Sequence, residues 1–244
     1  MLRMTLEGKL ILVTGAAQRI GKSLALGVAR AGADVILHFH TSRRQATSTF
    51  EEITELGRKA YLLQADLTNL EQAPRLIEEA SRIGQLYALI NNAAIFEPLS
   101  WSEVNPDNWQ RHLNLNLSAP FFLSQAFART VKPGERACIV NMLDWRALRP
   151  GSDHLPYTIA KAGLTALTKS LAIALAPNIT VNGVALGAIL PPANEAPPEG
   201  ILDKIPAARW AQLDEVVQLV IFLLSGPGYI TGEVIHLDGG RHLI

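Results

Sequence analysis

Short runs of apolar, largely β-branched residues alternate with segments of helical periodicity along the whole 244-residue chain. Seven runs have the length of a buried strand, at residues 9–14, 34–38, 60–65, 86–90, 137–141, 180–185 and 234–237. Helical segments lie between them, for example at residues 19–31, 44–56, 70–83, 108–131, 155–174 and 214–224. This order predicts an α/β fold, a doubly wound parallel sheet of the Rossmann type with helices on both faces.

Composition and charge limit what the chain can bind. No shift in composition divides it, so we expect one domain over residues 1–244. Twenty-two basic residues balance twenty-two acidic ones, and no net field attracts nucleic acid or an anionic membrane. The apolar runs are also too short to cross a bilayer. We therefore expect a small-molecule partner, and neither nucleic acid nor a membrane.

The chain has a single cysteine, Cys138, in the apolar run ACIV, so an internal disulfide is not possible. Its first residues, MLRMTLEGK, lack the apolar segment of a signal peptide. Both observations favour a reducing compartment and predict a cytoplasmic protein.

The first predicted strand runs directly into the turn TGAAQRIG at residues 14–21, and a helix follows. Glycines at Gly15 and Gly21 allow a tight turn and a close approach of backbone to a pyrophosphate, which the N–H groups of the helix start attract. Such turns are common, but this one occupies the first strand-helix unit, where a nucleotide fold places it.

The second predicted strand ends without the Asp or Glu that usually binds the free 2′-hydroxyl of NAD. Thr41, Ser42 and Arg43 instead offer hydroxyl and guanidinium donors for a 2′-phosphate. The alternative is that Arg43 and Arg44 are a solvated helix start, although arginine there opposes the helix dipole. At the end of the third strand, Asp66 has two interpretations, a cap for the next helix or a hydrogen-bond partner for adenine.

Tyr157 and Lys161 are four residues apart, so they share one face of a predicted helix. An ammonium near a phenol lowers the pKa of the tyrosine toward working pH, as a proton donor requires. Many helices carry such a pair merely as solvated residues. Asp144, thirteen residues before the tyrosine and just past the fifth strand, and Asn116 in the preceding helix favour a catalytic group.

Asn116 is followed four residues later by Pro120. A helical proline lacks the N–H that bonds the carbonyl of residue 116, so that carbonyl is released for another donor. A water held there would link Lys161 to solvent, whereas the alternative interpretation is a simple kink.

Together these segments resemble the short-chain dehydrogenase/reductase family over almost the whole chain. The matching segments are residues 14–21, Ala65-Asp66-Leu67, Asn91-Asn92-Ala93-Ala94, Asn116, Tyr157 with Lys161, Val181-Asn182-Gly183-Val184, and residues 230–240. The resemblance implies that Asn92 supports the sheet and cofactor, Tyr157 donates the proton, Lys161 binds the nicotinamide ribose and Asn116 anchors a relay water. It also implies a homotetramer formed through the helices at 108–131 and 155–174.

Two departures from the family pattern resemble pteridine reductases: Arg19 replaces the middle glycine of the turn, and Asp144 replaces the usual serine. The segment 38–42 resembles their NADPH-selecting segment, and Phe96 matches their pterin-stacking phenylalanine. The resemblance implies that Arg19 contacts both pyrophosphate and substrate. The expected catalytic residues are Asp144, Tyr157, Lys161 and Asn116, and the expected substrate-binding residues are Arg19, Phe96, Asp144 and Tyr157. The cofactor is expected to be NADPH, bound by Thr14, Gly15, Arg19, Ile20, Gly21, His40, Thr41, Ser42, Arg43, Asp66, Leu67, Asn92, Ala93, Lys161, Gly187 and Ile189.

The carboxyl group of Asp144 also indicates, on chemical grounds, which type of bond is reduced. Ketone reduction builds negative charge on oxygen, which an ionised carboxylate repels, whereas reduction of a C=N bond requires a proton on nitrogen. Asp144 therefore favours an imine-type substrate, and the resemblance implies that this is a dihydropterin, with Phe96 either stacked on its ring or merely packed under the lid. Two alternatives stay open, a 3-oxoacyl-type carbonyl reductase and a non-catalytic NADP-binding sensor, and we predict no metal site.

The stretch at residues 190–204 carries four prolines and interrupts the alternation just after the sixth strand. Ligands of open α/β sheets bind beyond the carboxyl ends of the strands, so this segment is either a substrate lid or a plain surface loop. Leu186-Gly187, which precedes it, departs from the Pro-Gly usual in the family.

Overall fold

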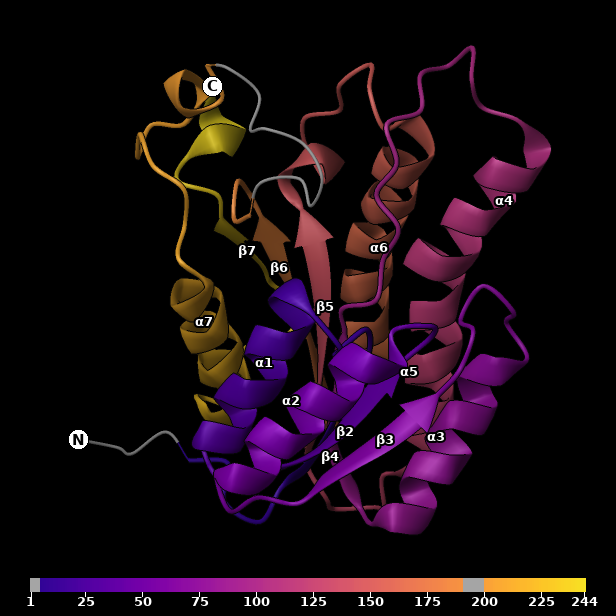
Figure 1. Ribbon diagram of the computed structural model, residues 1–244, viewed down its shortest axis with the longest axis vertical. Helices are drawn as coiled ribbons and strands as arrows, with labels where there is room; N and C mark the ends of the chain where they lie inside the picture. Colours follow the sequence, from indigo (N-terminus) through magenta and orange to yellow (C-terminus); the bar gives the residue numbers. More distant parts are fainter. Residues whose placement is uncertain (1–4, 191–199) are drawn as a thin grey trace.

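The computed structural model describes residues 5–190 and 200–244. Its described residues form a seven-stranded sheet in the order β3-β2-β1-β4-β5-β6-β7 (Figure 1). The strands are β1 (Leu10–Val13), β2 (Asp34–Phe39), β3 (Ala60–Gln64), β4 (Leu86–Asn91), β5 (Ala137–Asp144), β6 (Ile179–Leu186) and β7 (Val234–Leu237). All neighbouring pairs are parallel. The strand order reverses between β1 and β4, so the doubly wound fold that the sequence predicts is confirmed.

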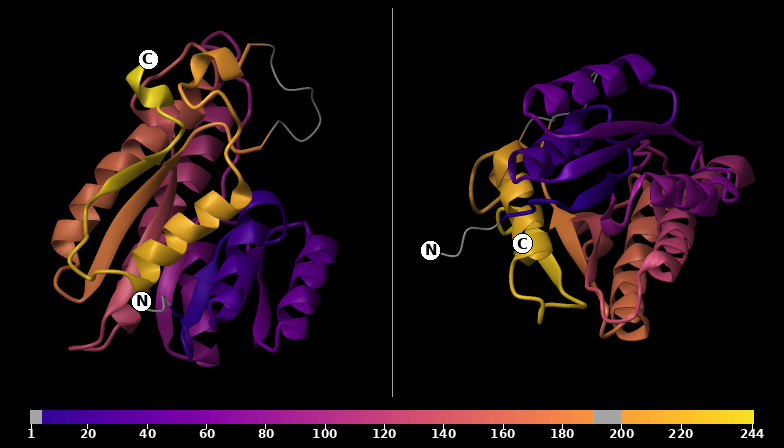
Figure 2. Two further views of the ribbon diagram at one scale, coloured as in Figure 1. Left: turned by 90° about the vertical axis from the view of Figure 1, so that its left-hand side faces the viewer. Right: turned by 90° about the horizontal axis from the view of Figure 1, so that it is seen from below.

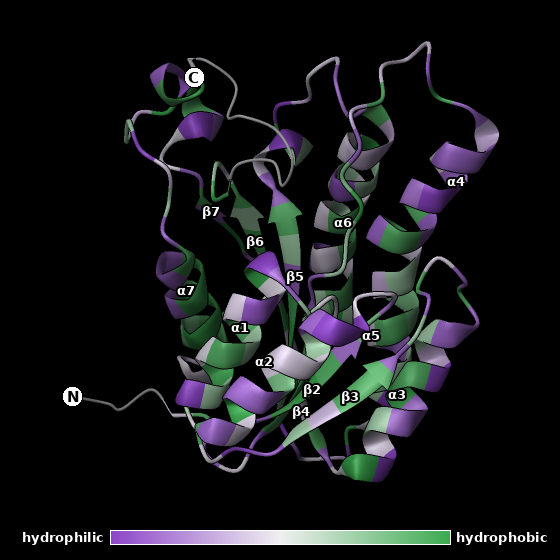
Figure 3. Cartoon of the chain, viewed as in Figure 1, coloured by the Kyte–Doolittle hydropathy of each residue, from purple (hydrophilic) through white to green (hydrophobic). Residues whose placement is uncertain are grey.

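Helices cover both faces of the sheet (Figures 1 and 2). On one face lie α1 (Arg19–Arg30), α2 (Arg43–Glu55) and α7 (Leu213–Ser225), and on the other α3 (Gln72–Ile83), α5 (Ala119–Thr130) and α6 (Leu155–Ala174). A hydrophobic core lies on each face of the sheet, and successive residues of a strand point into opposite cores. Ile11 packs on the α1 side and Leu12 on the α3 side, and both are fully buried. The strands are accordingly hydrophobic while the helices carry mixed faces (Figure 3). None of the helices in the described ranges is long and apolar enough to cross a membrane.

The segment predicted as one helix over 108–131 is interrupted. It consists of α4 (Pro106–Leu113), a π-helical turn at Asn114–Ser118 and then α5. Pro120 explains the interruption, because it cannot donate the N–H that an α-helix would direct to the carbonyl of Asn116. The N–H of Ala119 bonds instead to the carbonyl of Asn114, five residues earlier.

A buried polar network joins the central strands to the helices behind them. The amide of Asn91 on β4 donates to Asn141 on β5 at 2.8 Å and to Ser124 on α5 at 3.3 Å. Asn141 in turn donates to Thr168 on α6 at 2.9 Å. Because buried polar groups are costly unless paired, this network fixes α6 against the middle of β5.

Most of the predicted lid, residues 191–199, lies outside the described residues. Its described ends, Leu190 and Ile201, both line the large cavity at the carboxyl ends of the strands. A short 3₁₀ turn (Leu202–Lys204) follows.

Candidate active site

The turn after β1 is tied to the end of β4 by Thr14. The hydroxyl of Thr14 accepts the N–H groups of Asn92 and Ala93 at 2.9 and 3.0 Å and donates to the carbonyl of Ile90 at 3.2 Å. The side chain of Asn92 donates to the carbonyls of Thr14 and Gly15. The predicted cofactor residues Thr14, Gly15, Asn92 and Ala93 therefore form one hydrogen-bonded unit.

Gly21 shows how closely the backbone folds on itself in this turn. A Cβ added at Gly21 would lie 2.0 Å from the carbonyl oxygen of Gly15, so no side chain fits. Gly21 lies in the first turn of α1, which begins at Arg19, and the backbone N–H groups of this turn are available to an anion. This cradle fits the pyrophosphate of a dinucleotide.

His38 supports the turn from beneath, a role that the sequence argument did not assign. Its Nδ1 accepts the N–H of Gly15 at 3.2 Å, so its Nε2 carries the proton and donates to the carbonyl of Ala65 at 3.1 Å. Burial lowers the pKa of His38 to about 4, which keeps the ring neutral. The available signal was a histidine inside the apolar strand run DVILHF.

Arg19 adopts a φ of 54°, in the left-handed region that glycine favours. This is the position where the family usually has a glycine, and a non-glycine residue there costs about 1–3 kcal/mol. Arg19 and Ile20 both line the large cavity, which also contains Tyr157 and Lys161.

The predicted 2′-phosphate residues lie together at the end of β2. His40, Thr41 and Arg43 are exposed, and Ser42 precedes the first residue of α2. The Arg43 guanidinium lies 5.5 Å from the ring centroid of Phe39 and contacts Gln64 at 3.4 Å. An exposed guanidinium next to two hydroxyls fits a phosphate monoester.

Asp66 does not cap the following helix, as one sequence interpretation proposed. Its carboxylate accepts the N–H and hydroxyl of Thr68 at 2.9 and 2.7 Å and faces His40 at 3.9 Å. Burial opposes ionisation, but the Thr68 bonds and His40 hold the pKa of Asp66 below its usual value. The side chain of Leu67 is buried in the core, so only its backbone is available to a cofactor.

A cavity of about 590 Å³ opens at the carboxyl ends of β4, β5 and β6. This volume suits a small organic ligand. Its lining includes the predicted residues Arg19, Ile20, Asn92, Phe96, Asp144, Tyr157, Lys161, Gly187 and Ile189. The cavity thus extends from the glycine turn, which forms the phosphate cradle, to the side chains of Asp144, Tyr157 and Lys161.

Asp144 and Tyr157 are hydrogen-bonded. The phenol of Tyr157 donates to Oδ2 of Asp144 at 2.9 Å, and the N–H of Arg146 donates to Oδ1 at 2.8 Å. Burial raises the pKa of Asp144, against the lowering effects of the Arg146 bond and charge and of Tyr157. The pair therefore holds protons more firmly than either free side chain.

Lys161 does not lower the pKa of Tyr157, so that sequence expectation is wrong. Burial and the neighbouring Asp144 raise the pKa of Tyr157 well above its ordinary value. The Lys161 Nζ lies 5.7 Å from the Tyr157 ring centroid and donates to the carbonyl of Met142 at 2.6 Å. Burial lowers the pKa of Lys161 itself to about 8.

Asn116 is fully buried, and its side-chain amide hydrogen-bonds to the backbone of one neighbouring residue. Its Oδ1 accepts the N–H of Ile95 at 3.1 Å and its Nδ2 donates to the carbonyl of the same residue at 3.0 Å. Asn116 thereby fixes the segment that carries Phe96.

Phe96 is half-exposed at 50% and meets an aromatic partner from the chain itself. The ring of His154 stacks on it with centroids 3.9 Å apart and an interplanar angle of 15°, and Tyr157 contacts it edge to face. A substrate ring on Phe96 has to use the opposite face or replace the imidazole. Sequence reasoning missed His154, the N-cap residue of α6, which has a φ of 54°.

Gly187 and Ile189 follow β6 as predicted. The N–H of Gly187 bonds to the carbonyl of Leu237 at 3.0 Å, and a Cβ at Gly187 would lie 2.5 Å from the Cα of Asp238. Glycine is therefore required there even though the preceding proline of the family is replaced by Leu186. Ile189 is buried and lines the cavity.

A phosphate cradle that opens onto a buried tyrosine and lysine is the arrangement of a nucleotide-dependent oxidoreductase. Over residues 15–242 the chain matches the family described as Enoyl-(Acyl carrier protein) reductase, and it belongs to this family of short-chain dehydrogenases/reductases. It is an NADP-dependent oxidoreductase.

Three proteins illustrate its similarities. The 2-dehydro-3-deoxy-D-gluconate 5-dehydrogenase of Escherichia coli (strain K12) is 33% identical, over 97% of this chain and 96% of the relative. The 3-oxoacyl-[acyl-carrier-protein] reductase of Synechocystis sp. (strain ATCC 27184 / PCC 6803 / Kazusa) is 32% identical, over 96% and 97%. The crystal structure of FolM Alternative dihydrofolate reductase 1 from Brucella canis complexed with NADP superposes with a TM-score of 0.89 at 32% identity, over 97% and 95%.

Proposed function

We propose that the chain is an NADPH-dependent pteridine reductase, which reduces a C=N bond of a dihydropterin-type substrate such as dihydrobiopterin, dihydromonapterin or a dihydrofolate-like compound. The observation that carries this proposal is the carboxylate of Asp144, hydrogen-bonded to Tyr157 at 2.9 Å inside the cavity. The similarity to the Brucella canis dihydrofolate reductase complexed with NADP supports it. We further propose that residues 1–244 act as one catalytic domain.

The proposed roles follow from the contacts of these side chains. NADPH, when bound, supplies the hydride. Thr14, Asn92 and Gly21 shape the turn that would hold its pyrophosphate, and Arg43 would contact its 2′-phosphate. Lys161, buried behind Tyr157, would bind the nicotinamide ribose and hold positive charge near the reacting ring.

The proton would reach the substrate nitrogen through the pair of Tyr157 and Asp144. Both groups have raised pKa values, so the pair retains a proton at neutral pH. In carbonyl reduction, where oxygen becomes negative, an ionised Asp144 at this position is repulsive. A nitrogen that gains a proton does not suffer this penalty.

A second candidate is a reductase or dehydrogenase acting on a carbonyl or hydroxyl carbon. The relatives from Escherichia coli and Synechocystis, a gluconate-type dehydrogenase and a 3-oxoacyl reductase, favour it. The retained Tyr157 and Lys161 serve either chemistry, and they argue against a non-catalytic NADP sensor.

One experiment separates these functions. NADPH oxidation is measured with dihydrobiopterin, dihydrofolate and an acetoacetyl thioester, for the parent and for Asp144→Ser. We expect the parent to prefer the dihydropterins and the serine variant to gain carbonyl reduction relative to pterin reduction. A serine variant that reduces pterins as well as the parent, or a parent that prefers the thioester, would overturn the proposal.

We also propose a homotetramer formed through residues 108–131, which span most of α4 and all of α5, and through α6. Ile159 and Ile173 on α6 are exposed at 45% and 82%, as residues of an uncovered interface would be. The mass in solution tests this, and a monomer would contradict it.

A further inference from the structure

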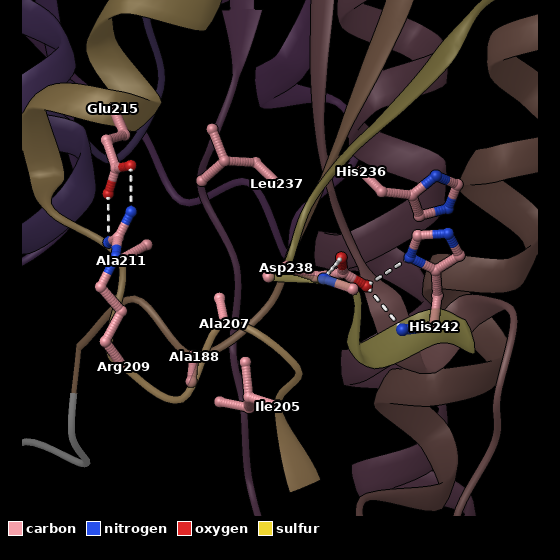
Figure 4. A pocket seen from close by; sticks show the side chains of 12 residues that line it. Ala188, Ile205, Ala207, Arg209, Ala211, Glu215, His236, Leu237, Asp238 and His242 are labelled. Atoms are coloured by element: carbon pink, nitrogen blue, oxygen red, sulfur yellow. Dashed lines mark hydrogen bonds and ion pairs between the residues drawn. The ribbon is translucent and has the colours of Figure 1, made fainter. Parts of the chain in front are cut away.

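Arg241 lies on a short turn that the buried Asp238 holds in place. Asp238 follows β7, and its carboxylate accepts the N–H of Gly240 at 3.0 Å, the N–H of His242 at 2.8 Å and the His242 ring at 2.8 Å. Figure 4 shows the bonds from Asp238 to His242 at the edge of a second cavity, of about 350 Å³. Arg241 itself lines the large cavity that contains Tyr157.

The guanidinium of Arg241 is stacked on the indole of Trp145. Its central carbon lies 4.1 Å from the ring centroid. Stacking uses one face of the planar group and leaves its N–H donors free at the edge, which suits bidentate binding of a carboxylate. Within residues 5–190 and 200–244, this guanidinium has no hydrogen bond or ion pair.

The other charges near Trp145 are already matched. Arg146 pairs with Asp153 at 2.8 Å, and Asp144 accepts from Tyr157 and from the Arg146 backbone. Among the described residues, no carboxylate lies within ion-pair distance of the Arg241 guanidinium at this end of the cavity. Burial and the repulsion from Arg146 lower its pKa, although three carboxylates oppose this.

We propose that Arg241, stacked on Trp145, binds a carboxylate of the substrate, so that the cavity selects substrates with an anionic tail. This inference rests on the proposed function for the reacting ring and adds the substrate class. It favours dihydrofolate, which carries carboxylates, over dihydrobiopterin, which carries none. The same chemistry would hold the carboxylate of a sugar acid.

Kinetics with paired substrates test the inference. Arg241→Gln should raise KM for dihydrofolate by about 10- to 100-fold, the effect of losing hydrogen bonds to a charged group. The kcat should stay within about twofold, because uniform binding is lost, and KM for dihydrobiopterin should not change. The matched control is Arg149→Gln, which removes the same charge from an exposed site outside the cavity and should alter neither KM. Equal changes for both substrates, or none, would overturn the inference.

A binding measurement separates this inference from the proposed function. 4-Aminobenzoylglutamate and D-gluconate are titrated calorimetrically into the NADP⁺-bound parent, Arg241→Lys and Arg241→Gln. Binding of either compound by the parent, weakened in the lysine variant and lost in the glutamine variant, supports the carboxylate site even if no pterin is reduced. The compound that binds identifies the tail. Pterin reduction by a parent that binds neither compound would reject the carboxylate site and keep the proposed function.

Discussion

The hydrogen bond from Tyr157 to Asp144 gives a prediction on stability and turnover together. Tyr157→Phe removes the phenolic donor 2.9 Å from Oδ2 and leaves the buried carboxylate with the N–H of Arg146 alone. A hydrogen bond to a charged group contributes about 1.5–3 kcal/mol. For a chain of this size, the loss corresponds to a decrease in Tm of roughly 3–12 °C.

The size of this loss should depend on pH. Burial raises the folded-state pKa of Asp144 above its unfolded value, so the stability that Asp144 contributes is lost as pH rises through that window. The Tyr157 bond stabilises the ionised form and offsets part of this loss. The stability difference between parent and variant should therefore grow as pH rises above the ordinary aspartate pKa of about 4 and the carboxyl ionises.

Tyr87→Phe is the matched control. Tyr87 donates to an uncharged acceptor, the carbonyl of Leu224, at 2.6 Å. Its loss should cost about 0.5–1.5 kcal/mol without the same pH dependence. Urea unfolding at several pH values measures both variants. Turnover should fall ~10²–10⁴-fold only for Tyr157→Phe, because only that residue is the proposed acid. A Tyr157 variant with the control's pH profile, or with normal turnover, would refute the reasoning.

Three further predictions concern cofactor and backbone. The pKa of Lys161 is about 8, so its ammonium form predominates below that pH. NADPH affinity, measured by fluorescence titration, should therefore be constant below about pH 8 and weaken above it. Lys161→Met should abolish this pH dependence. The parent should bind NADPH more tightly than NADH and Arg43→Ala should shrink the difference; equal affinities in the parent would contradict the assignment of the 2′-phosphate site. Gly187→Ala should destabilise by about 1–3 kcal/mol in urea unfolding, because its Cβ would lie 2.5 Å from the backbone of Asp238, and unchanged stability would show that this backbone can move.

The alternation of apolar runs was sufficient to predict the fold. Each of the seven runs overlaps an observed strand, and the helix predicted at 155–174 has the observed bounds of α6. Such runs indicate strands because a strand buried on both faces needs apolar residues at every position, as in the fully buried Leu10–Val13. The π turn at Asn114–Ser118 was not predicted, since periodicity continues through it and only Pro120 signalled an irregularity.

The sequence predicted which chemical groups share the cavity but not their electrostatics. The spacing of Tyr157 and Lys161 is enough to place them on one face of a helix. The pKa of Tyr157, by contrast, depends on which hydrogen-bond acceptors the two side chains meet in the folded protein. Lys161 bonds to the carbonyl of Met142, and Tyr157 to Asp144. Arg241 was missed for a related reason. Its stacking on Trp145 joins positions almost a hundred residues apart, and no local pattern indicates it.

The raised pKa of Tyr157 has to be reconciled with its proposed role as an acid. A tyrosine that holds its proton this firmly is a poor donor to a weakly basic oxygen, because the resulting phenolate would lie against the Asp144 carboxylate. The difficulty lessens if the pair acts as a unit. When Asp144 carries a proton, which its own raised pKa favours, transfer from Tyr157 to a substrate nitrogen can be accompanied by transfer from Asp144 to the phenolic oxygen. No phenolate then remains, and the negative charge rests on the carboxylate, where the Arg146 N–H already stabilises it. A serine at this position cannot accept that charge, so the aspartate has a chemical role that the usual hydroxyl does not supply.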